Sequence, residues 1–225
     1  GYIENIVYML QAPGIDQENF LKALTLFNIL YYDYSGGSLS TFVGKAVASG
    51  LEDLYGSISA SLSALSGSKH GKGLLDSALF TEMLISELGK EFNESAAEEF
   101  LKSYLKKNGT LPGFEIGTLR AEDARSRLFY EYASMNFPSH PMVKASLLIR
   151  SLGSKIIKNG FLSPDAIGGA VLVAAGFERY EYFPLLFAMS RLVGVCTQIL
   201  YERLEANKGK GVPSMNPSYL YKQSD

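Results

Sequence analysis

Apolar residues recur with helical spacing along nearly the whole chain. Phe20, Leu24, Phe27 and Leu30 follow one another at intervals of three and four, which places them on one face of a helix that Asp16 can cap. Glycine and proline separate this segment from others like it, and no segment shows sustained alternation of period two. Further helices are expected over residues 38–50, 53–65, 75–88, 94–107, 121–135, 143–157, 165–175 and 180–204. The sequence therefore predicts an all-α fold.

The helix expected over residues 53–65 carries small residues on one side. Gly56, Ser57, Ala60, Ser61 and Ala64 recur there at intervals of three and four. Small side chains let a second helix approach closely. That second helix can belong to another subunit or to the same chain, and the stripe is compatible with both.

Composition and charge narrow the class of protein. The 225 residues are 47% apolar and 20% charged, which fits a globular domain, and the net charge of −2 gives no strong attraction to nucleic acid or to a membrane surface. The longest apolar run, residues 167–177, is too short to cross a bilayer. Cys196 is the one cysteine, so no internal disulfide can form and a cytoplasmic location is expected.

Common catalytic and metal-binding motifs do not match. One cysteine and two distant histidines, His70 and His140, give no zinc spacing, so no metal is expected. His70 lies in a Gly/Ser/Lys loop at the start of a helix, where the helix N-terminus favours a neutral imidazole that can donate a hydrogen bond to a developing oxyanion. A surface histidine that caps its own helix fits the same position.

Five segments, in order, resemble motifs of the citrate synthase family. Residues 29–42 resemble its His-x-Asp-His-x-Gly-Gly-Asn-x-Ser stretch, and residues 47–71 resemble the helix that runs into Gly-Pro-Leu-His-Gly. The other three segments are 111–125 (Pro-Gly-Phe-Gly-His through Asp-Pro-Arg), 141–144 (Pro-Asn-Val-Asp) and 187–194 (Ser-Arg-Ala-Gly).

The resemblance implies the helical citrate synthase fold with part of the N-terminal sequence missing, since the match begins well inside a typical member of the family. By this resemblance, residues 1–108 are large-domain helices, 109–185 a region like the small domain, and 186–225 a C-terminal helix and tail that return to the large domain. It also implies a homodimer through the helices at 38–50 and 53–66.

The family condenses an acyl-CoA with oxaloacetate, and its functional residues transfer one at a time. An aspartate removes the methyl proton, a histidine stabilises the enol, and further histidines and arginines hold the oxo acid. His70 falls on the enol-stabilising histidine. Arg125 and Arg191 fall on two carboxylate-binding arginines, whose guanidinium groups suit two-point contact with a carboxylate.

The resemblance also implies three replacements. Tyr34 stands for a substrate-binding histidine, Ile116 for the histidine that polarises the oxo-acid carbonyl, and Lys144 for the catalytic aspartate. General acid–base catalysis contributes ~10²–10⁴-fold and an oxyanion donor ~10²–10³-fold. A chain that lacks both is predicted to have little ordinary citrate synthase activity.

The expected cofactor loop spans residues 108–119. The family packs the backbone of this loop around the CoA adenine and places a basic residue after it, which implies a coenzyme A thioester site at Leu111, Pro112, Gly113, Phe114 and Arg120. A turn that the fold needs, followed by a solvated arginine, explains these residues equally well.

Three functions remain open from the sequence. The first is a CoA-thioester-binding protein of the citrate synthase family whose catalytic site has diverged. The second is an active acyltransferase of the citrate or methylcitrate type, or a citryl-CoA lyase, with an altered base. The third is a non-catalytic dimeric scaffold or regulatory protein, which could pair with a full-length paralogue.

Overall fold

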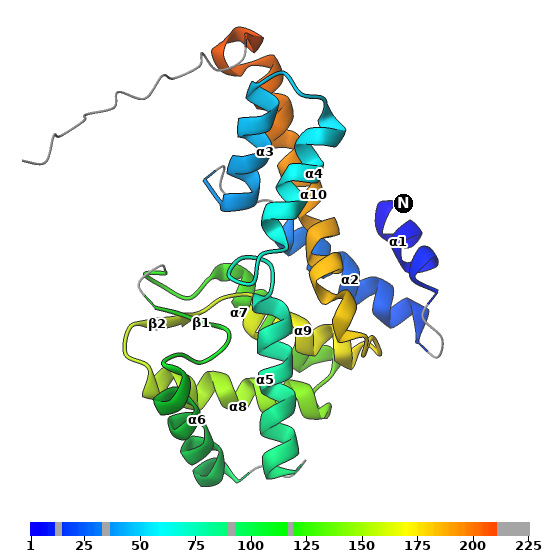
Figure 1. Ribbon diagram of the computed structural model, residues 1–225. Coiled ribbons are helices and arrows are strands. Elements are labelled where there is room, and N and C mark those ends of the chain that lie inside the picture. The colour runs from blue at the N-terminus through cyan, green and yellow to red at the C-terminus, as the bar shows by residue number, and fades with distance from the viewer. Residues whose placement is uncertain (12–14, 33–36, 90–92, 117–118, 211–225) are drawn as a thin grey trace, which may run out of the picture.

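The computed structural model describes residues 1–11, 15–32, 37–89, 93–116 and 119–210 (Figure 1). These residues form ten α-helices, two 3-10 turns and one two-stranded sheet, so the all-α prediction is confirmed. The helices are α1 (Tyr2–Leu10), α2 (Gln17–Tyr31), α3 (Leu39–Ser49), α4 (Leu54–Leu65), α5 (Gly73–Leu88), α6 (Glu94–Asn108), α7 (Ala124–Asn136), α8 (Pro141–Ile156), α9 (Asp165–Ala174) and α10 (Phe183–Leu204). The strands are β1 (Phe114–Ile116) and β2 (Gly160–Leu162), and the 3-10 turns are Tyr180–Tyr182 and Ala206–Gly209.

Capping side chains set several helix starts. Asp16 accepts hydrogen bonds from the backbone N–H groups of Glu18 and Asn19, as the sequence predicts. Asp53 and Asn93 cap α4 and α6 in the same way. Each cap satisfies N–H groups that have no partner inside the helix, which fixes where the helix begins.

The two-stranded sheet of β1 and β2 corrects the loop predicted over residues 108–119. Phe114 pairs with Leu162 in an antiparallel register. Three residues are too few to show period-two alternation, so the sequence pattern could not reveal this strand. Gly113 precedes β1 with a φ of 85°, and a Cβ there would lie 2.7 Å from the Cβ of Ala166, so glycine allows β1 to approach the start of α9.

The core of the molecule surrounds α9. Every residue of this helix from 166 to 173 is buried, and α5, α7 and α8 surround it (Figure 1). One hydrophobic cluster runs from Ile3 to Phe187 and includes residues of α1, α2 and the first turns of α10. The predicted domain boundaries at residues 108 and 185 stay a prediction.

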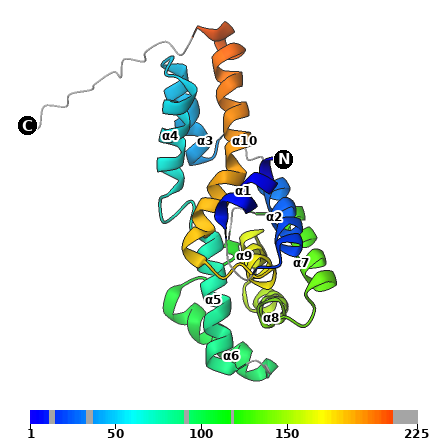
Figure 2. The same ribbon diagram turned by 90° about the vertical axis from the view of Figure 1, so that its right-hand side faces the viewer.

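Helices α3 and α4 and the C-terminal half of α10 form an arm that projects from this body (Figures 1 and 2). A separate cluster of Ala48, Val195 and Ile199 holds the arm together. Ser57 and Ser61 are fully buried, and the Ser61 hydroxyl donates to the backbone carbonyl of Ser40 at 2.8 Å. The buried part of the small-residue stripe therefore packs against helices of the same chain.

Among the described residues, Tyr180–Leu204 is long and apolar enough to cross a membrane by length and composition, with a mean hydropathy of 1.6. The core helix of a globular protein passes the same test. Phe183, Leu186 and Arg191 of this stretch are buried inside the molecule, which fits a core helix.

Candidate active site

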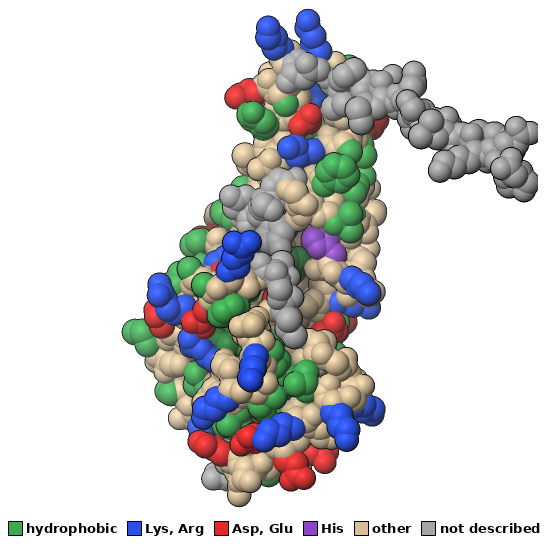
Figure 3. All heavy atoms as spheres, turned by 90° about the vertical axis from the view of Figure 1, so that its left-hand side faces the viewer, with side chains coloured by type: hydrophobic (Ala, Val, Ile, Leu, Met, Phe, Trp, Pro, Cys, Tyr) green, Lys and Arg blue, Asp and Glu red, His purple; other side chains and the backbone are tan. Residues whose placement is uncertain are grey.

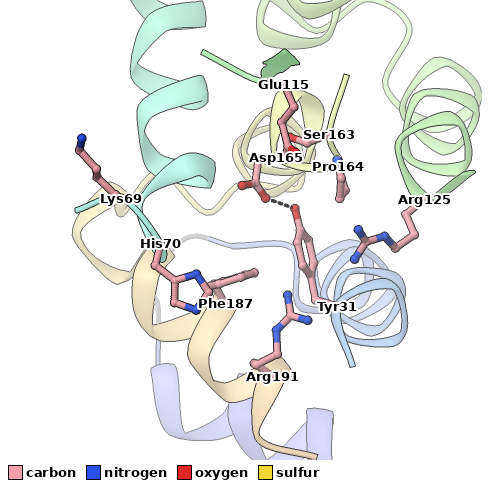
Figure 4. A pocket seen from close by; sticks show the side chains of 10 residues that line it. All are labelled: Tyr31, Lys69, His70, Glu115, Arg125, Ser163, Pro164, Asp165, Phe187 and Arg191. Atoms are coloured by element: carbon pink, nitrogen blue, oxygen red, sulfur yellow. Dashed lines mark hydrogen bonds between the residues drawn. The ribbon is translucent and has the colours of Figure 1, made fainter. Parts of the chain in front are cut away.

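A cavity of about 170 Å³ lies where the arm meets the body. The loop between α4 and α5, the end of α2, the start of α7, strand β1, the start of α9 and the middle of α10 all contribute to its wall (Figure 4). Its lining residues are Tyr31, Lys69, His70, Glu115, Arg125, Ser163, Pro164, Asp165, Phe187 and Arg191.

The α4–α5 loop holds His70 in a defined tautomer. The backbone N–H of Ser40 donates to Nε2 of His70 at 3.2 Å, and the Ser40 hydroxyl lies 2.9 Å from the same nitrogen. Because a backbone N–H can only donate, Nε2 is the acceptor and the ring proton sits on Nδ1. Burial, together with the positive charge of Arg191, lowers the pKa of His70, which favours this neutral form. His70 is therefore a neutral hydrogen-bond donor at the cavity.

Asp165 is a partly buried carboxylate of the cavity wall. It is the first residue of α9, and the Tyr31 hydroxyl donates to its Oδ1 at 2.5 Å (Figure 4). Burial raises the pKa of Asp165, while the hydrogen bond from Tyr31 and the charges of Arg191 and Arg125 act in the opposite direction. A Cβ on Gly73 would collide with Oδ2 of Asp165, so glycine at the start of α5 leaves room for this carboxylate.

Two arginines direct positive charge toward the same space. Arg191 of α10 is only 3% exposed, and its guanidinium lies 5.0 Å from the centre of the Phe187 ring. Arg125 at the start of α7 bonds Asp123 through Nε and Nη2, which holds the pKa of Asp123 low. Figure 4 shows both guanidinium groups turned toward Tyr31, whereas the Lys69 ammonium points away. The cavity thus combines a base, a neutral donor and two cations suited to a small carboxylic acid.

The structure places Lys144 away from this cavity. This lysine is exposed on α8 and does not line the cavity, where Asp165 supplies the ionisable side chain instead. Pro141 and Pro164 both stand at the start of a helix, so the short Pro-Asn-Val-Asp motif could be placed at either. Burial, which sequence cannot supply, distinguishes Asp165 from Lys144.

The remaining predicted residues lie in different surroundings. Tyr34 lies outside the described residues. Ile116 is in β1 opposite Gly160, and Arg120 is exposed. Of the expected cofactor loop, Leu111 and Phe114 are buried in the core, and Pro112-Gly113 forms the turn between them.

Sequence reasoning missed five polar or ionisable residues of the cavity wall: Tyr31, Lys69, Glu115, Ser163 and Asp165. Tyr31 ends a helix whose apolar face the pattern does predict, and Ser163 and Asp165 flank a proline at a helix start. Glu115 follows the Pro-Gly-Phe turn as an added negative charge. None of these patterns specifies that the side chain faces a cavity. No group of three His, Cys, Asp or Glu residues in the described part of the chain could hold a metal ion.

The model of the citrate synthase C-terminal domain matches residues 1–213, and the chain belongs to the citrate synthase family. The predicted resemblance is thereby confirmed.

Individual relatives support the same family. The mitochondrial citrate synthase of Daucus carota is 28% identical over 210 residues, which are 90% of this chain and 43% of that protein. The crystal structure of citrate synthase from Thermotoga maritima has a TM-score of 0.71 and 28% identity, over 90% of this chain and 52% of that one. A ternary complex of citrate synthase from Thermoplasma acidophilum with carboxymethyl coenzyme A and oxaloacetate shares the fold, with a TM-score of 0.71 and 23% identity over 90% of this chain and 55% of that one. The chain spans about half the length of these proteins.

Proposed function

We propose that this chain makes or breaks a carbon–carbon bond beside a coenzyme A thioester, with Asp165 as the base. The observation that carries this function is the cavity itself, in which a partly buried carboxylate, a neutral imidazole donor and two guanidinium groups meet. Residues that are far apart in the sequence supply these groups, and their combination suits condensation of a thioester with an oxo acid.

Each group has a chemical task in that reaction. Asp165 accepts a proton from the carbon beside the thioester carbonyl, and its raised pKa brings this base closer to neutral pH. The Nδ1–H of His70 donates to the oxygen on which the enol charge develops. Arg125 and Arg191 hold carboxylate groups of the oxo acid, as their place in the family motif implies.

Asp165 changes the interpretation that the catalytic site has diverged. The expected loss of activity depended on Lys144 at the base position and on Ile116 in place of a histidine. With Asp165 in the cavity, a carboxylate is available as the base. Among the described residues, Ile116 is then the one family site residue that is still replaced. We therefore favour an active acyltransferase, or a lyase that runs the same step backward, over a silent binding protein or a scaffold.

Coenzyme A binding is inferred from the Pro-Gly-Phe turn. The Thermoplasma acidophilum complex contains carboxymethyl coenzyme A, and this chain has the same fold. The buried side chains of Leu111 and Phe114 anchor the turn, which leaves its backbone to meet the adenine as in the family, with Arg120 exposed for a phosphate. Calorimetry with free coenzyme A tests this site, and Arg120→Ala should weaken binding. No heat over a wide concentration range would favour the scaffold.

The activity test follows the free thiol that appears when acetyl-CoA condenses with oxaloacetate and water then hydrolyses the thioester of the citryl-CoA formed. The wild type should release free thiol, and His70→Ala and Asp165→Asn should each remove the signal. Cleavage of citryl-CoA is measured in parallel, because the same residues serve the reverse step. An intact protein that shows neither reaction would refute the proposal.

We also propose that the chain forms a homodimer through its arm. Leu39 and Phe42 of α3 and Leu54 and Tyr55 of α4 are exposed, Phe42 by 60% and Tyr55 by 85%, and Figure 3 shows apolar side chains on one face of the arm. Exposed apolar surface of this kind is typical of protein interfaces. Light scattering should give twice the monomer mass, and a stable mixed species with a full-length relative would support pairing with a paralogue. The cytoplasmic location stays a prediction.

A further inference from the structure

Strand β1 directs Glu115 toward the cavity. Successive side chains of a strand point to opposite faces. Phe114 is 6% exposed and packs against Gly153 of α8, where a Cβ would lie 2.5 Å from its ring, so Phe114 faces the core. Glu115 therefore faces the other side of the two-stranded sheet, where it lines the cavity, and Figure 4 shows its carboxyl group on the Asp165 side.

The cavity consequently contains two carboxyl groups with different surroundings. Asp165 accepts the hydrogen bond from Tyr31, which favours its charged form. Glu115 is half-buried and faces the carboxylates of Asp165 and Asp123. Burial, followed by repulsion from these two groups, raises the pKa of Glu115, and only Arg125 acts against the shift. The other charged or titratable groups on the cavity wall are Tyr31, Lys69, His70 and Arg191.

Burial raises the pKa of both carboxyl groups, but Asp165 also receives the hydrogen bond from Tyr31 that stabilises its charged form, so Glu115 is the one better placed to hold a proton. Two carboxyl groups in one site avoid ionising together, and the one without a strong donor takes the proton. A carboxylic acid substrate held by the arginines would add further negative charge and strengthen this distribution. A neutral carboxyl group can donate a hydrogen bond and a proton, whereas Ile116 can do neither.

We propose that Glu115, as a neutral carboxylic acid, protonates the carbonyl oxygen of the oxo acid when the new carbon–carbon bond forms. This inference rests on the proposed function and deepens it. Glu115 lies next to Ile116 in β1. It would thus donate the proton to the oxo-acid carbonyl in place of the histidine that Ile116 replaces.

The proposed step balances in atoms and electrons. Asp165 takes the proton from the carbon beside the thioester, and the electron pair of that C–H bond passes into the enol and then into the new carbon–carbon bond. The electron pair of the C=O double bond moves to oxygen, which takes the proton of Glu115. Glu115 is then a carboxylate and Asp165 a carboxylic acid, and exchange with solvent restores both.

Glu115→Gln separates this role from that of the base. Two reactions are measured on each variant: condensation of acetyl-CoA with oxaloacetate, and exchange of the acetyl methyl protons with deuterated water in the presence of malate, which cannot accept the carbon. Exchange needs only the base and the enol donor. Glu115→Gln should therefore keep the exchange and lose condensation by ~10²–10⁴-fold. Asp165→Asn should lose both, and Glu131→Gln, at an exposed carboxyl of α7, should lose neither.

The pH profile gives a second readout. Because the acid form of Glu115 is required, condensation by the wild type should fall as the pH rises through the pKa of Glu115, and this fall should be absent in Glu115→Gln. Infrared difference spectra at neutral pH should contain the carbonyl stretch of a protonated carboxyl in the wild type and in Glu131→Gln, but not in Glu115→Gln.

The outcomes are distinguishable. Condensation by Glu115→Gln at the rate of the wild type, or loss of methyl exchange in this variant, would overturn the role of Glu115. A wild type that neither exchanges nor condenses would instead refute the proposed function, and the infrared band alone would then decide whether Glu115 holds a proton.

Discussion

Asp165 and Lys144 both lie in the first turn of a helix, but only Asp165 is enclosed. Asp165→Asn keeps the shape of the side chain and removes its basicity, so we expect kcat for condensation to fall by ~10²–10⁴-fold. Lys144→Ala changes an exposed side chain, and we expect kcat within about twofold of the wild type. Steady-state assays of the two variants, with circular dichroism as a check of folding, compare the positions directly. A loss of kcat in Lys144→Ala well beyond twofold would indicate that this lysine belongs to the active site.

Tyr31 acts on the base through one hydrogen bond. Its ring packs among Phe27, Phe129 and Phe187, with ring centres 4.5, 5.9 and 5.1 Å away, so Tyr31→Phe should keep the packing and remove only the hydroxyl. Loss of a donor to Asp165 disfavours the carboxylate and raises its pKa further. A hydrogen bond to a charged group contributes about 1.5–3 kcal/mol, so the acidic limb of the kcat profile should move up by about one to two pH units. An unchanged limb would mean that Asp165 is not the base.

Sequence motifs alone predicted part of this site. His70, Arg125 and Arg191 were predicted from motifs and line one cavity. The position of the family's catalytic aspartate was matched to Lys144, which implied that the base is lost, because a short motif with a proline at a helix start occurs twice in the sequence. What separates the two places is burial and the contact with Tyr31, and both depend on how α2, α5 and α9 pack.

At the scale of the element, the start of α5 is shaped around the carboxylate of Asp165. Alanine is favoured over glycine in a helix by roughly 0.5–1 kcal/mol, so Gly73→Ala should leave the Tm unchanged or slightly higher. Its Cβ would nevertheless displace Oδ2 of Asp165, which should disturb the bond from Tyr31 and lower kcat by at least about tenfold, the equivalent of about 1.4 kcal/mol. Thermal melts and rate assays on the same sample test this. A fall in Tm with kcat unchanged would show that the added methyl group displaces the start of α5 and leaves the carboxylate of Asp165 in place.

Helices were the predictable elements because their apolar spacing extends over several turns. The ranges expected over 53–65, 94–107 and 180–204 agree with α4, α6 and α10 to within a few residues. The two-stranded sheet was missed because three-residue strands carry too little pattern, although its strand β1 directs Glu115 to the cavity. The elements that pattern cannot identify are thus among those that bring the site together.

At the scale of the whole molecule, the proposed dimer should make stability depend on protein concentration. If two copies associate only when folded, mass action favours the folded state at higher concentration and raises the Tm. Phe42→Asp adds a charge to an exposed side chain of α3 and should leave the fold of the chain intact while it separates the subunits. The Tm of the wild type should therefore rise with concentration over a hundredfold range, and that of Phe42→Asp should stay constant and match the wild type at high dilution. The stability of a monomer does not depend on its concentration, so a constant Tm in the wild type would contradict the dimer. In that case light scattering on the same samples would give the mass of a single chain.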